Sequence, residues 1–312
     1  MLDQAIDFNK QVAAQDDGSR LDRWLADHLN QYSRSHLQKL ITKGEVRVND
    51  KIVTPHYRLK CRDQVTLNHE LVPDSTPGNW GEISLVEENN DYLVVNKPSG
   101  ILTHPAPGST EKTLTDWLIE KYPDIAHVGE DLTRPGIVHR LDRDVSGLIL
   151  VPRSNDSFSY FKKQFQSRNI AKTYLALVYG QIDEDGKIDL PIARSRSNRN
   201  RMAARSDGQG RPALTSYKII KKYPHLTFLE VMPKTGRMHQ IRVHLKAIGN
   251  SIVGDKLYAP EPSRSTNLPR IFLHAYQLRF TDINGQTKQY QSPLPNSLQS
   301  FLAKLDEKSS SE

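Results

Sequence analysis

Apolar residues near the N-terminus recur at helical spacing and are followed by short, strand-like segments. One apolar stripe predicts a helix over residues 20–29, and a second helix is predicted from a cap at Ser33 to a stop at Gly44. The first stripe consists of Leu21, Trp24, Leu25 and Leu29. Residues 46–53 then predict two short strands around a turn. The pattern indicates a small domain of helices and strands over residues 19–71.

The rest of the chain alternates strands with a few helices. Strands are predicted over residues 91–97, 172–180, 214–220, 227–232 and 271–280. Helices are predicted over residues 154–168 and 237–248, and an apolar stripe on the second predicts that it packs on the sheet. That stripe consists of Met238, Ile241, Leu245 and Ile248. More strands than helices, in mixed order, favour an α+β domain with a largely antiparallel sheet over a doubly wound fold.

Three segments lack these patterns and set the domain layout. Residues 1–18 are polar and predict a flexible arm, and residues 72–81 are rich in proline, glycine and serine and predict a linker. Residues 305–312 form the expected C-terminal tail, of which residues 308–312 are expected to fray. The larger domain is therefore expected over residues 82–304.

Composition narrows the class of protein. The 312 residues are 37% hydrophobic and contain no apolar run of the ~18 residues that a membrane span needs. The N-terminus has neither a basic nor an apolar region, so no signal peptide is predicted. Cys61 is the single cysteine, which excludes an intramolecular disulfide and a multi-cysteine zinc site. We expect a cytoplasmic monomer, and the net charge of +7 weakly favours a polyanionic partner.

The stretch from His139 to Gly147, H-R-L-D-R-D-V-S-G, is the most informative part of the chain. It places Asp142 between two arginines, ahead of Gly147 and the apolar run of residues 148–151. Nearby cations favour the ionised form of a carboxylate, and an ionised carboxylate can act as a nucleophile. The alternative interpretation is a solvated turn with an ordinary ion pair.

Three further segments carry candidate chemistry. Residues 172–180 alternate, so that Tyr174 shares a face with Ala176 and Val178, and core filling is the alternative role for Tyr174. Residues 235–245 place Arg242 on a predicted helix. Its two histidines, at positions 239 and 244, are five residues apart, which does not suit a helical zinc pair. Residues 96–105 form a strand-to-turn element.

The N-terminal segment resembles an S4 RNA-binding domain. The resemblance rests on R-L-D-R-W-L, S-R-S-H-L-Q-K-L-I and G-E-V-R-V-N-D-K-I-V. It implies that basic side chains contact RNA phosphates, which positions RNA without reading its sequence. The candidate contacts are Arg23, Arg34, Lys39, Lys43, Arg47 and Lys51. The alternative is that these charges form only the solvated face of a small domain.

The larger domain resembles the RluA-type pseudouridine synthases, and most closely the RluD-like members with an N-terminal S4 domain. The four segments described above occur in the family's order, together with R-P-G-I-V before H-R-L-D, G-D-K-L-Y and L-H-A. The resemblance covers residues 20–280. Val145 departs from the pattern, since threonine is expected there, and this puts a local hydrogen bond in doubt.

The resemblance implies an isomerase that converts uridine to pseudouridine in RNA without a cofactor or a metal. Asp142 would be the catalytic aspartate, Arg242 the arginine paired with it, and Tyr174 the tyrosine that packs on the uracil. Arg140 matches the arginine that displaces the target nucleotide from its stack. Asp142 could attack the ribose C1′, assist glycal formation or add to C6 of the base, and the residues do not decide among these routes.

Two sets of residues are assigned to RNA contact with less detail. Arg237, His239 and Gln240 match positions that would touch RNA or support the reacting groups. Residues 194–205 hold five arginines, among them Arg199 and Arg201, and predict a basic hairpin that reaches into an RNA groove. A loop that becomes ordered only on binding is the compatible alternative.

The expected substrate is large-subunit, 23S-type ribosomal RNA or its assembly precursor. A transfer RNA pseudouridine synthase is the first alternative. A non-catalytic S4-type RNA-binding or ribosome assembly factor is the second, but it would have no need of Asp142, Tyr174 and Arg242 together. A glycoside or nucleoside hydrolase would normally show two cooperating carboxylates.

Overall fold

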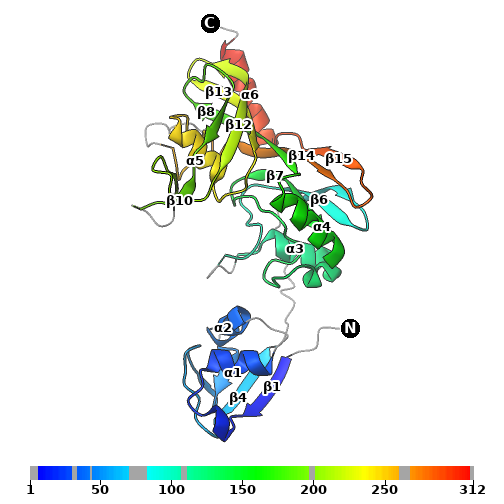
Figure 1. The fold of residues 1–312 in the computed structure, drawn as a ribbon, viewed down its shortest axis with the longest axis vertical. Helices are drawn as coiled ribbons and strands as arrows, with labels where there is room; N and C mark the ends of the chain where they lie inside the picture. The colour runs from blue at the N-terminus through cyan, green and yellow to red at the C-terminus, as the bar shows by residue number, and fades with distance from the viewer. Residues whose placement is uncertain are drawn as a thin grey trace. The chain divides into compact units, whose positions relative to one another are not determined.

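The computed structural model describes residues 6–29, 34–42, 44–69, 83–106, 111–196, 201–259 and 268–309. The chain divides into two compact units, residues 1–78 and residues 79–312 (Figure 1). The predicted linker over residues 72–81 and the predicted cap at Ser33 lie outside the described residues. No helix in the described part of the chain is long and apolar enough to cross a membrane.

The smaller unit packs two helices with a four-stranded antiparallel sheet. The helices are α1 (Leu21–His28) and α2 (Arg34–Thr42). The strands, in sheet order, are β1 (Ile6–Gln11), β4 (Gln64–His69), β2 (Val46–Val48) and β3 (Lys51–Ile52). Gly44 follows α2 with a φ of +80°, the left-handed conformation that ends helices. The predicted order of two helices and then two short strands around a turn is present.

The expected flexible arm over residues 1–18 is wrong for its described part. Strand β1 pairs with β4 along the edge of the sheet, from Ile6 opposite His69 to Gln11 opposite Gln64. Phe8 packs against the small hydrophobic core, and Val12 is buried in it. Cross-strand hydrogen bonds and these two apolar contacts order a segment whose polar composition had suggested an arm.

A buried carboxylate ties the two helices of the smaller unit together. The Asp22 side chain is fully buried and accepts hydrogen bonds from Arg20, Arg34 and Gln38. Burial alone would raise the pKa of Asp22, but these hydrogen bonds hold it well below its ordinary value. Arg34, a candidate RNA contact, is therefore also a structural partner of Asp22.

The larger unit is built on one mixed sheet of nine strands. In sheet order these are β5 (Ser84–Glu88), β6 (Tyr92–Lys97), β7 (Ser146–Pro152), β14 (Leu273–Thr281), β8 (Ala171–Tyr179), β13 (Leu226–Pro233), β12 (Leu214–Tyr223) and β9 (Gly186–Asp189), and β15 (Thr287–Gln291) pairs with β14. All neighbours run antiparallel except β7 and β14, which are parallel. The predicted α+β class with a largely antiparallel sheet is confirmed.

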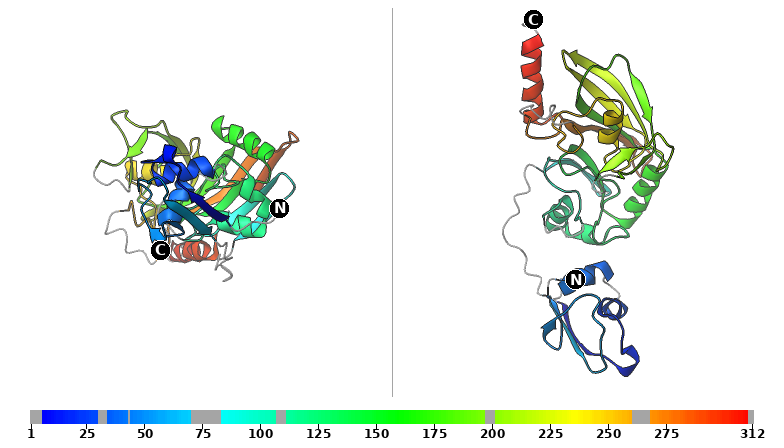
Figure 2. Two further views of the ribbon diagram at one scale, coloured as in Figure 1. Left: turned by 90° about the horizontal axis from the view of Figure 1, so that it is seen from below. Right: turned by 90° about the vertical axis from the view of Figure 1, so that its left-hand side faces the viewer.

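Helices and a small hairpin complete the larger unit. They are α3 (Leu114–Lys121), the short 3-10 helix η2 (Pro123–His127), α4 (Asn155–Gln166), α5 (Gln240–Ala247), α6 (Asn296–Ser309) and the hairpin of β10 (Ile192–Arg194) and β11 (Met202–Ala204). Helix α6 lies beside the half of the sheet that contains β12 and β13 (Figure 2), where the Tyr223 hydroxyl donates a hydrogen bond to Asp306 at 2.8 Å. The expected fraying is wrong for Lys308 and Ser309, because α6 continues through the start of the tail to Ser309.

Two local expectations are also corrected. Strand β8 was expected to alternate, but residues from Thr173 to Val178 are buried on both faces because it lies in the middle of the sheet. Helix α5 begins at Gln240, three residues later than predicted, since His239 adopts a left-handed conformation with φ +56°. Met238 and Ile248 are consequently 38% and 37% exposed, and only Ile241 and Leu245 of the predicted stripe are buried.

The parallel pair of β7 and β14 places the H-R-L-D segment beside the middle of the sheet. Ser146 pairs with His274, and Gly147 pairs with Ala275. Gly147 has a φ of +119°, and a Cβ there would lie 2.3 Å from the carbonyl oxygen of Ala275. The close approach therefore requires glycine at the point where the chain leaves the Asp142 loop and enters β7.

Lys97, the last residue of β6, fixes the loop on the other side of this junction. Its side chain is fully buried, and Nζ donates to the carbonyl oxygens of Pro98, Ile101 and Arg143 at 2.8, 2.8 and 3.1 Å. Burial lowers the pKa of Lys97 to about 7. Because three carbonyls accept three hydrogens, the contacts require the ammonium form, and they hold the loop after β6 to the loop that carries Asp142.

We predict that Lys97→Met destabilises the larger unit by about 3 kcal/mol, because buried carbonyl oxygens lose their donor. Calorimetry on the full chain should show a fall of several degrees in the Tm of that unit, with the exposed Lys187→Met as the control. An unchanged transition would mean that the three hydrogen bonds do not stabilise the fold.

Candidate active site

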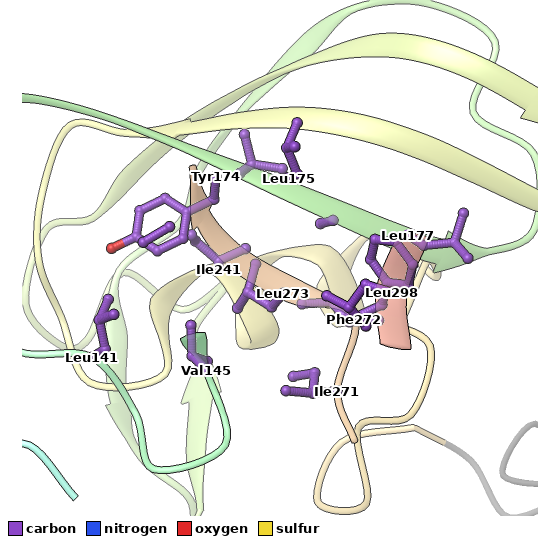
Figure 3. Packing of buried hydrophobic residues seen from close by; sticks show 14 of the residues in the cluster. Leu141, Val145, Tyr174, Leu175, Leu177, Ile241, Ile271, Phe272, Leu273 and Leu298 are labelled. Carbon is purple, nitrogen blue, oxygen red and sulfur yellow. The ribbon is translucent and has the colours of Figure 1, made fainter. Parts of the chain in front are cut away.

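The loop of residues 139–145 holds Asp142 between two buried apolar anchors. Leu141 is 3% exposed and Val145 is 2% exposed, and both lie in the main hydrophobic cluster (Figure 3). The Thr103 hydroxyl donates to the Leu141 carbonyl at 2.9 Å and accepts from the Leu141 amide at 3.2 Å. Val145, where threonine was expected, thus fills an apolar site, and its amide bonds to the Asp142 carbonyl at 3.2 Å.

Arg242 reaches Asp142 from helix α5 and is held in place by a second carboxylate. Its Nη1 donates to Asp142 Oδ2 at 3.0 Å, while Nε and Nη2 donate to the two carboxylate oxygens of Asp255 at 2.8 Å each. Burial opposes the charge of Arg242, but Asp255 and Asp142 raise its pKa above the ordinary value. The predicted pairing of Asp142 with Arg242 is thus present in the geometry.

Asp255 is a functional candidate to which the sequence assigned no role. Its side chain is fully buried, and Oδ1 also accepts from the backbone amides of Leu257 and Tyr258 at 2.9 and 3.1 Å. The bidentate contact fixes the plane of the Arg242 guanidinium, which fixes the direction of Nη1. The segment G-D-K-L-Y was noted only as part of the family resemblance, and its only local signal was an acid before a tight turn.

His239 and Tyr258 form a second contact beside the carboxylate. The Tyr258 hydroxyl lies 2.8 Å from His239 Nδ1 and accepts from the Met202 amide at 2.8 Å. If the hydroxyl donates to Nδ1, the proton of the ring lies on Nε2, which faces Asp142 Oδ2 at 3.8 Å. Burial lowers the pKa of His239, which favours this neutral ring. The Arg242 guanidinium also lies over the Tyr258 ring, with its Cζ 5.0 Å from the ring centroid.

Tyr174 projects from β8 toward the Asp142 loop. Figure 3 shows its ring near Ile241 and above Leu141, with the hydroxyl pointing away from Phe272. The side chain is 9% exposed and belongs to the main hydrophobic cluster, and it also lines the cavity described below. Tyr174 therefore packs in the core and faces the cavity. Burial, with the Asp142 charge, raises the pKa of Tyr174, so the hydroxyl stays protonated.

These groups face a cavity of about 670 Å³ in the larger unit. Eight lysine and arginine residues line it, whereas Asp142 is the one carboxylate among its described lining residues. A second cavity of about 480 Å³ lies on the other side of Asp142 and shares Arg140, His239 and Arg242 with the first. The volume and the charge of the first cavity suit a nucleotide.

Arg140, the candidate for displacing a nucleotide, is exposed and lines both cavities. Its Nη1 lies 3.2 Å from Nε2 of His104. Nδ1 of His104 lies 3.2 Å from the Pro105 carbonyl, so a proton on Nδ1 leaves Nε2 free to accept from Arg140. Burial and the Arg140 charge lower the pKa of His104, in keeping with a neutral ring. The sequence had named His104 only as part of a turn.

Arg237 and Gln240 line the first cavity, and their hydrogen bonds support its wall. Gln240 is buried, with Oε1 accepting from the Thr235 hydroxyl and the Arg237 amide and Nε2 donating to Leu214 and Thr215. Nε of Arg237 donates to the Pro212 carbonyl at 3.1 Å. Of the two roles the sequence allowed, the contacts of Gln240 favour support.

The other candidate RNA contacts lie on both units. In the smaller unit Arg23, Arg47 and Lys51 are exposed. Lys43 lies outside the described residues, and the Lys39 side chain is not described. In the larger unit Arg201 borders β11, where its Nε is buried and without a hydrogen-bond partner in the described structure. Arg199 lies outside the described residues.

Comparison with known proteins decides the family. The family model for RNA pseudouridylate synthases matches residues 91–247, and the model for S4 domains matches residues 19–65. The chain belongs to the RNA pseudouridylate synthase family. It is therefore an isomerase that converts uridine to pseudouridine in RNA, and its smaller unit contains an S4 domain.

Relatives of this synthase match over most of its length. An uncharacterized RNA pseudouridine synthase of Chloroflexus aurantiacus is 40% identical over 295 residues, covering 93% of this chain and 91% of the relative. The ribosomal large subunit pseudouridine synthase D of Nitrosomonas europaea is 35% identical, covering 91% and 84%. The solved structure of human RNA pseudouridylate synthase domain containing 1 matches with a TM-score of 0.58 and 26% identity, over 74% of this chain and 97% of that one.

We predict that Asp255→Asn lowers the rate of pseudouridine formation by about 10-fold or more, because the guanidinium of Arg242 loses a charge-assisted bidentate partner. Single-turnover assays measure the rate, and circular dichroism checks that the variant is folded. A folded variant with the wild-type rate would show that Asp255 does not orient Arg242 for the reaction.

Proposed function

We propose that this synthase isomerises specific uridines in large-subunit, 23S-type ribosomal RNA, with Asp142 as the catalytic carboxylate. The observation that carries the proposal is the ion pair of Asp142 with Arg242 at 3.0 Å in a cationic cavity that also contains Tyr174. The relatives named ribosomal large subunit pseudouridine synthase D support the choice of RNA. The enzyme would act in the cytoplasm as a monomer.

The reaction requires no net gain or loss of atoms. The bond from ribose C1′ to N1 of the uracil breaks, the base turns, and a bond from C1′ to C5 forms, while the C5 hydrogen leaves as a proton and N1 gains one. Asp142 would stabilise or bond to C1′ during cleavage, or add to C6 of the base. Arg242 keeps one carboxylate oxygen engaged, while the other oxygen, Oδ1, has no hydrogen bond from the described residues and is available to the substrate.

The cavity must retain the detached base as well as release it from the sugar. Tyr174 offers an aromatic face, and Ile137, Ile241 and Leu273 add apolar surface to the same cavity. A ring that stacks on the uracil limits its escape and excludes water, which would otherwise trap the sugar. Because the Tyr174 hydroxyl is protonated, it could accept the C5 proton only while it gives its own proton to a neighbouring group.

The target uridine must leave its stack before it reaches Asp142. Extruding a nucleotide costs a few kcal/mol, which contacts in the extruded state must offset. Arg140 lies between the two cavities and is exposed, so its guanidinium can occupy the space that the base vacates. We propose that His104 holds Arg140 before RNA binds.

Positively charged surfaces outside the cavity would position the RNA. In the S4 domain Arg23, Arg47 and Lys51 would contact phosphates, and Arg201, next to β11, would do so together with Arg199. Such contacts are independent of base sequence and release counterions. They would orient the RNA while the cavity selects the uridine.

The sharpest test of the function is Asp142→Asn, with the neighbouring, exposed Asp144→Asn as the matched control. A site-resolved pseudouridine map of total RNA, by carbodiimide labelling and primer extension, should lose one or a few large-subunit signals without the gene. Wild type and Asp144→Asn should restore them and Asp142→Asn should not, because it removes the charge that acts at the sugar or the base.

If Asp142→Asn restored the pseudouridine signals, Asp142 would not be required for the reaction. Signals lost only from transfer RNA would replace the proposed substrate with transfer RNA. No lost signal in either RNA class would overturn both substrate assignments.

Deletion of residues 1–72 tests the role of the S4 domain. We predict that RNA affinity and its dependence on salt fall more than the rate of the chemical step, because phosphate contacts are lost while the cavity remains. Filter binding over a salt series and single-turnover rates at saturating enzyme separate the two effects. Unchanged affinity would contradict an RNA-positioning role for this domain.

A further inference from the structure

Lys172 lies in the wall of the catalytic cavity and has no role in the reaction described above. It stands two residues before Tyr174 on β8, so both side chains project from the same face of the strand. Its Nζ lies 5.8 Å from the centroid of the Phe165 ring. On the other side, a Cβ at Gly236 would lie 3.8 Å from this nitrogen. The ammonium is thus held between α4 and the turn before α5.

No residue in the described part of the chain supplies a counter-charge for this ammonium. Within the described residues Lys172 Nζ has neither a hydrogen bond nor an ion pair, and it lies over the ring of Phe165. Asp142 is the sole described carboxylate lining the cavity, and Arg242 already occupies it. A partly desolvated cation without an acid nearby is costly in a folded protein unless a ligand compensates it.

Burial also acts on the charge itself. It lowers the pKa of Lys172 to about 8, and no carboxylate opposes this effect. An anion in the cavity would restore the fully protonated form and would gain from the low polarity around it. Perturbed groups of this kind concentrate at functional sites.

The neighbouring cations indicate which anion is bound. Arg134, Lys162 and Arg168 line the same cavity as Lys172. The first two already have partners outside the cavity lining, Asp131 for Arg134 and Glu130 for Lys162. This excess of positive charge suits a phosphate group and offers nothing specific to a neutral base. Residues i and i+2 of a strand lie roughly 7 Å apart, which is comparable to the separation of a base from its flanking phosphate.

We propose that Lys172 binds a non-bridging phosphate oxygen next to the target uridine while Tyr174 packs on its base. Lys172 is then a substrate-positioning contact that fixes the backbone on one side of the extruded nucleotide. The inference rests on the proposed function for the identity of that nucleotide. The contact itself, between an ammonium and an RNA phosphate, can be measured without turnover.

The binding test compares Lys172→Met and Lys172→Arg, each in an Asp142→Asn background that stops the reaction. The probe is a large-subunit ribosomal RNA transcript, titrated over a series of salt concentrations. Loss of one phosphate contact should reduce the slope of log affinity against log salt by roughly 0.7 to 0.9 for Lys172→Met. Lys172→Arg and the control Lys288→Met, on β15 away from both cavities, should keep the slope.

A second arm locates the phosphate. In the otherwise wild-type enzyme, Lys172→Met should raise KM about 10-fold or more and change kcat less. RNA with a neutral methylphosphonate at one of the two linkages flanking the modified uridine should raise the wild-type KM similarly. Lys172→Met and the methylphosphonate together should raise KM no more than either change alone, since both remove the same contact.

The outcomes separate this inference from the proposed function. An unchanged salt slope for a folded Lys172→Met, or additive effects with methylphosphonates at both linkages, overturns the phosphate contact. A fall in kcat at constant KM and constant slope also overturns it and assigns Lys172 to the base. If no pseudouridine forms in ribosomal RNA but the slope still falls, the proposed substrate fails and the ammonium–phosphate contact stands.

Discussion

The structure of the site depends on the buried guanidinium of Arg242, which joins two carboxylates that serve different purposes. The Asp255 carboxylate accepts hydrogen bonds from Nε and Nη2 and is fully buried. The Asp142 carboxylate accepts one from Nη1 and still faces the cavity. Taken by themselves, the two carboxylates and the guanidinium carry one net negative charge, inside a cavity lined mainly by cations. One carboxylate anchors the cation, so that the cation can orient the other.

The fold supplies this arrangement by bringing three loops to one place. The Asp142 loop enters β7 where β7 runs parallel to β14, and Lys97 holds that loop to the end of β6. Arg242 comes from α5, whose start is fixed by the buried Gln240. The Asp142 loop and helix α5 are therefore each attached to the sheet by a buried polar contact, which keeps their positions in the absence of RNA.

Local pattern predicted much of the fold, and the failures have physical causes. Periodicity predicted the helices, the strands and the largely antiparallel sheet, whereas the S4 domain and the pairing of Asp142 with Arg242 were implied by the family resemblance of the ordered motifs. Residues 6–11 were misjudged because a polar edge strand is held by pairing with β4, whose residues lie 53 to 63 positions away in sequence, so that no local pattern contains the contact. The tail failed for a related reason, since Tyr223 of β12 holds Asp306 of α6.

The site showed the same division between local and distant information. The residues next to Asp142 in sequence are enough to make it a candidate. Asp255, His104 and Lys172 become candidates only when the fold shows which residues surround them. Asp255 meets Arg242 across 13 residues, and His104 meets Arg140 across 36. Lys172 resembled an ordinary strand residue until the cavity showed it to lack a counter-charge.

The central claim is that a single carboxylate cleaves and re-forms a glycosidic bond while the cavity retains the base. Its most direct test is a mass balance on purified enzyme and large-subunit ribosomal RNA, with uridine, pseudouridine and free uracil quantified by mass spectrometry. The account predicts that every uridine lost reappears as pseudouridine and that no uracil is released. Free uracil in proportion to the uridine lost would contradict it and identify a hydrolase.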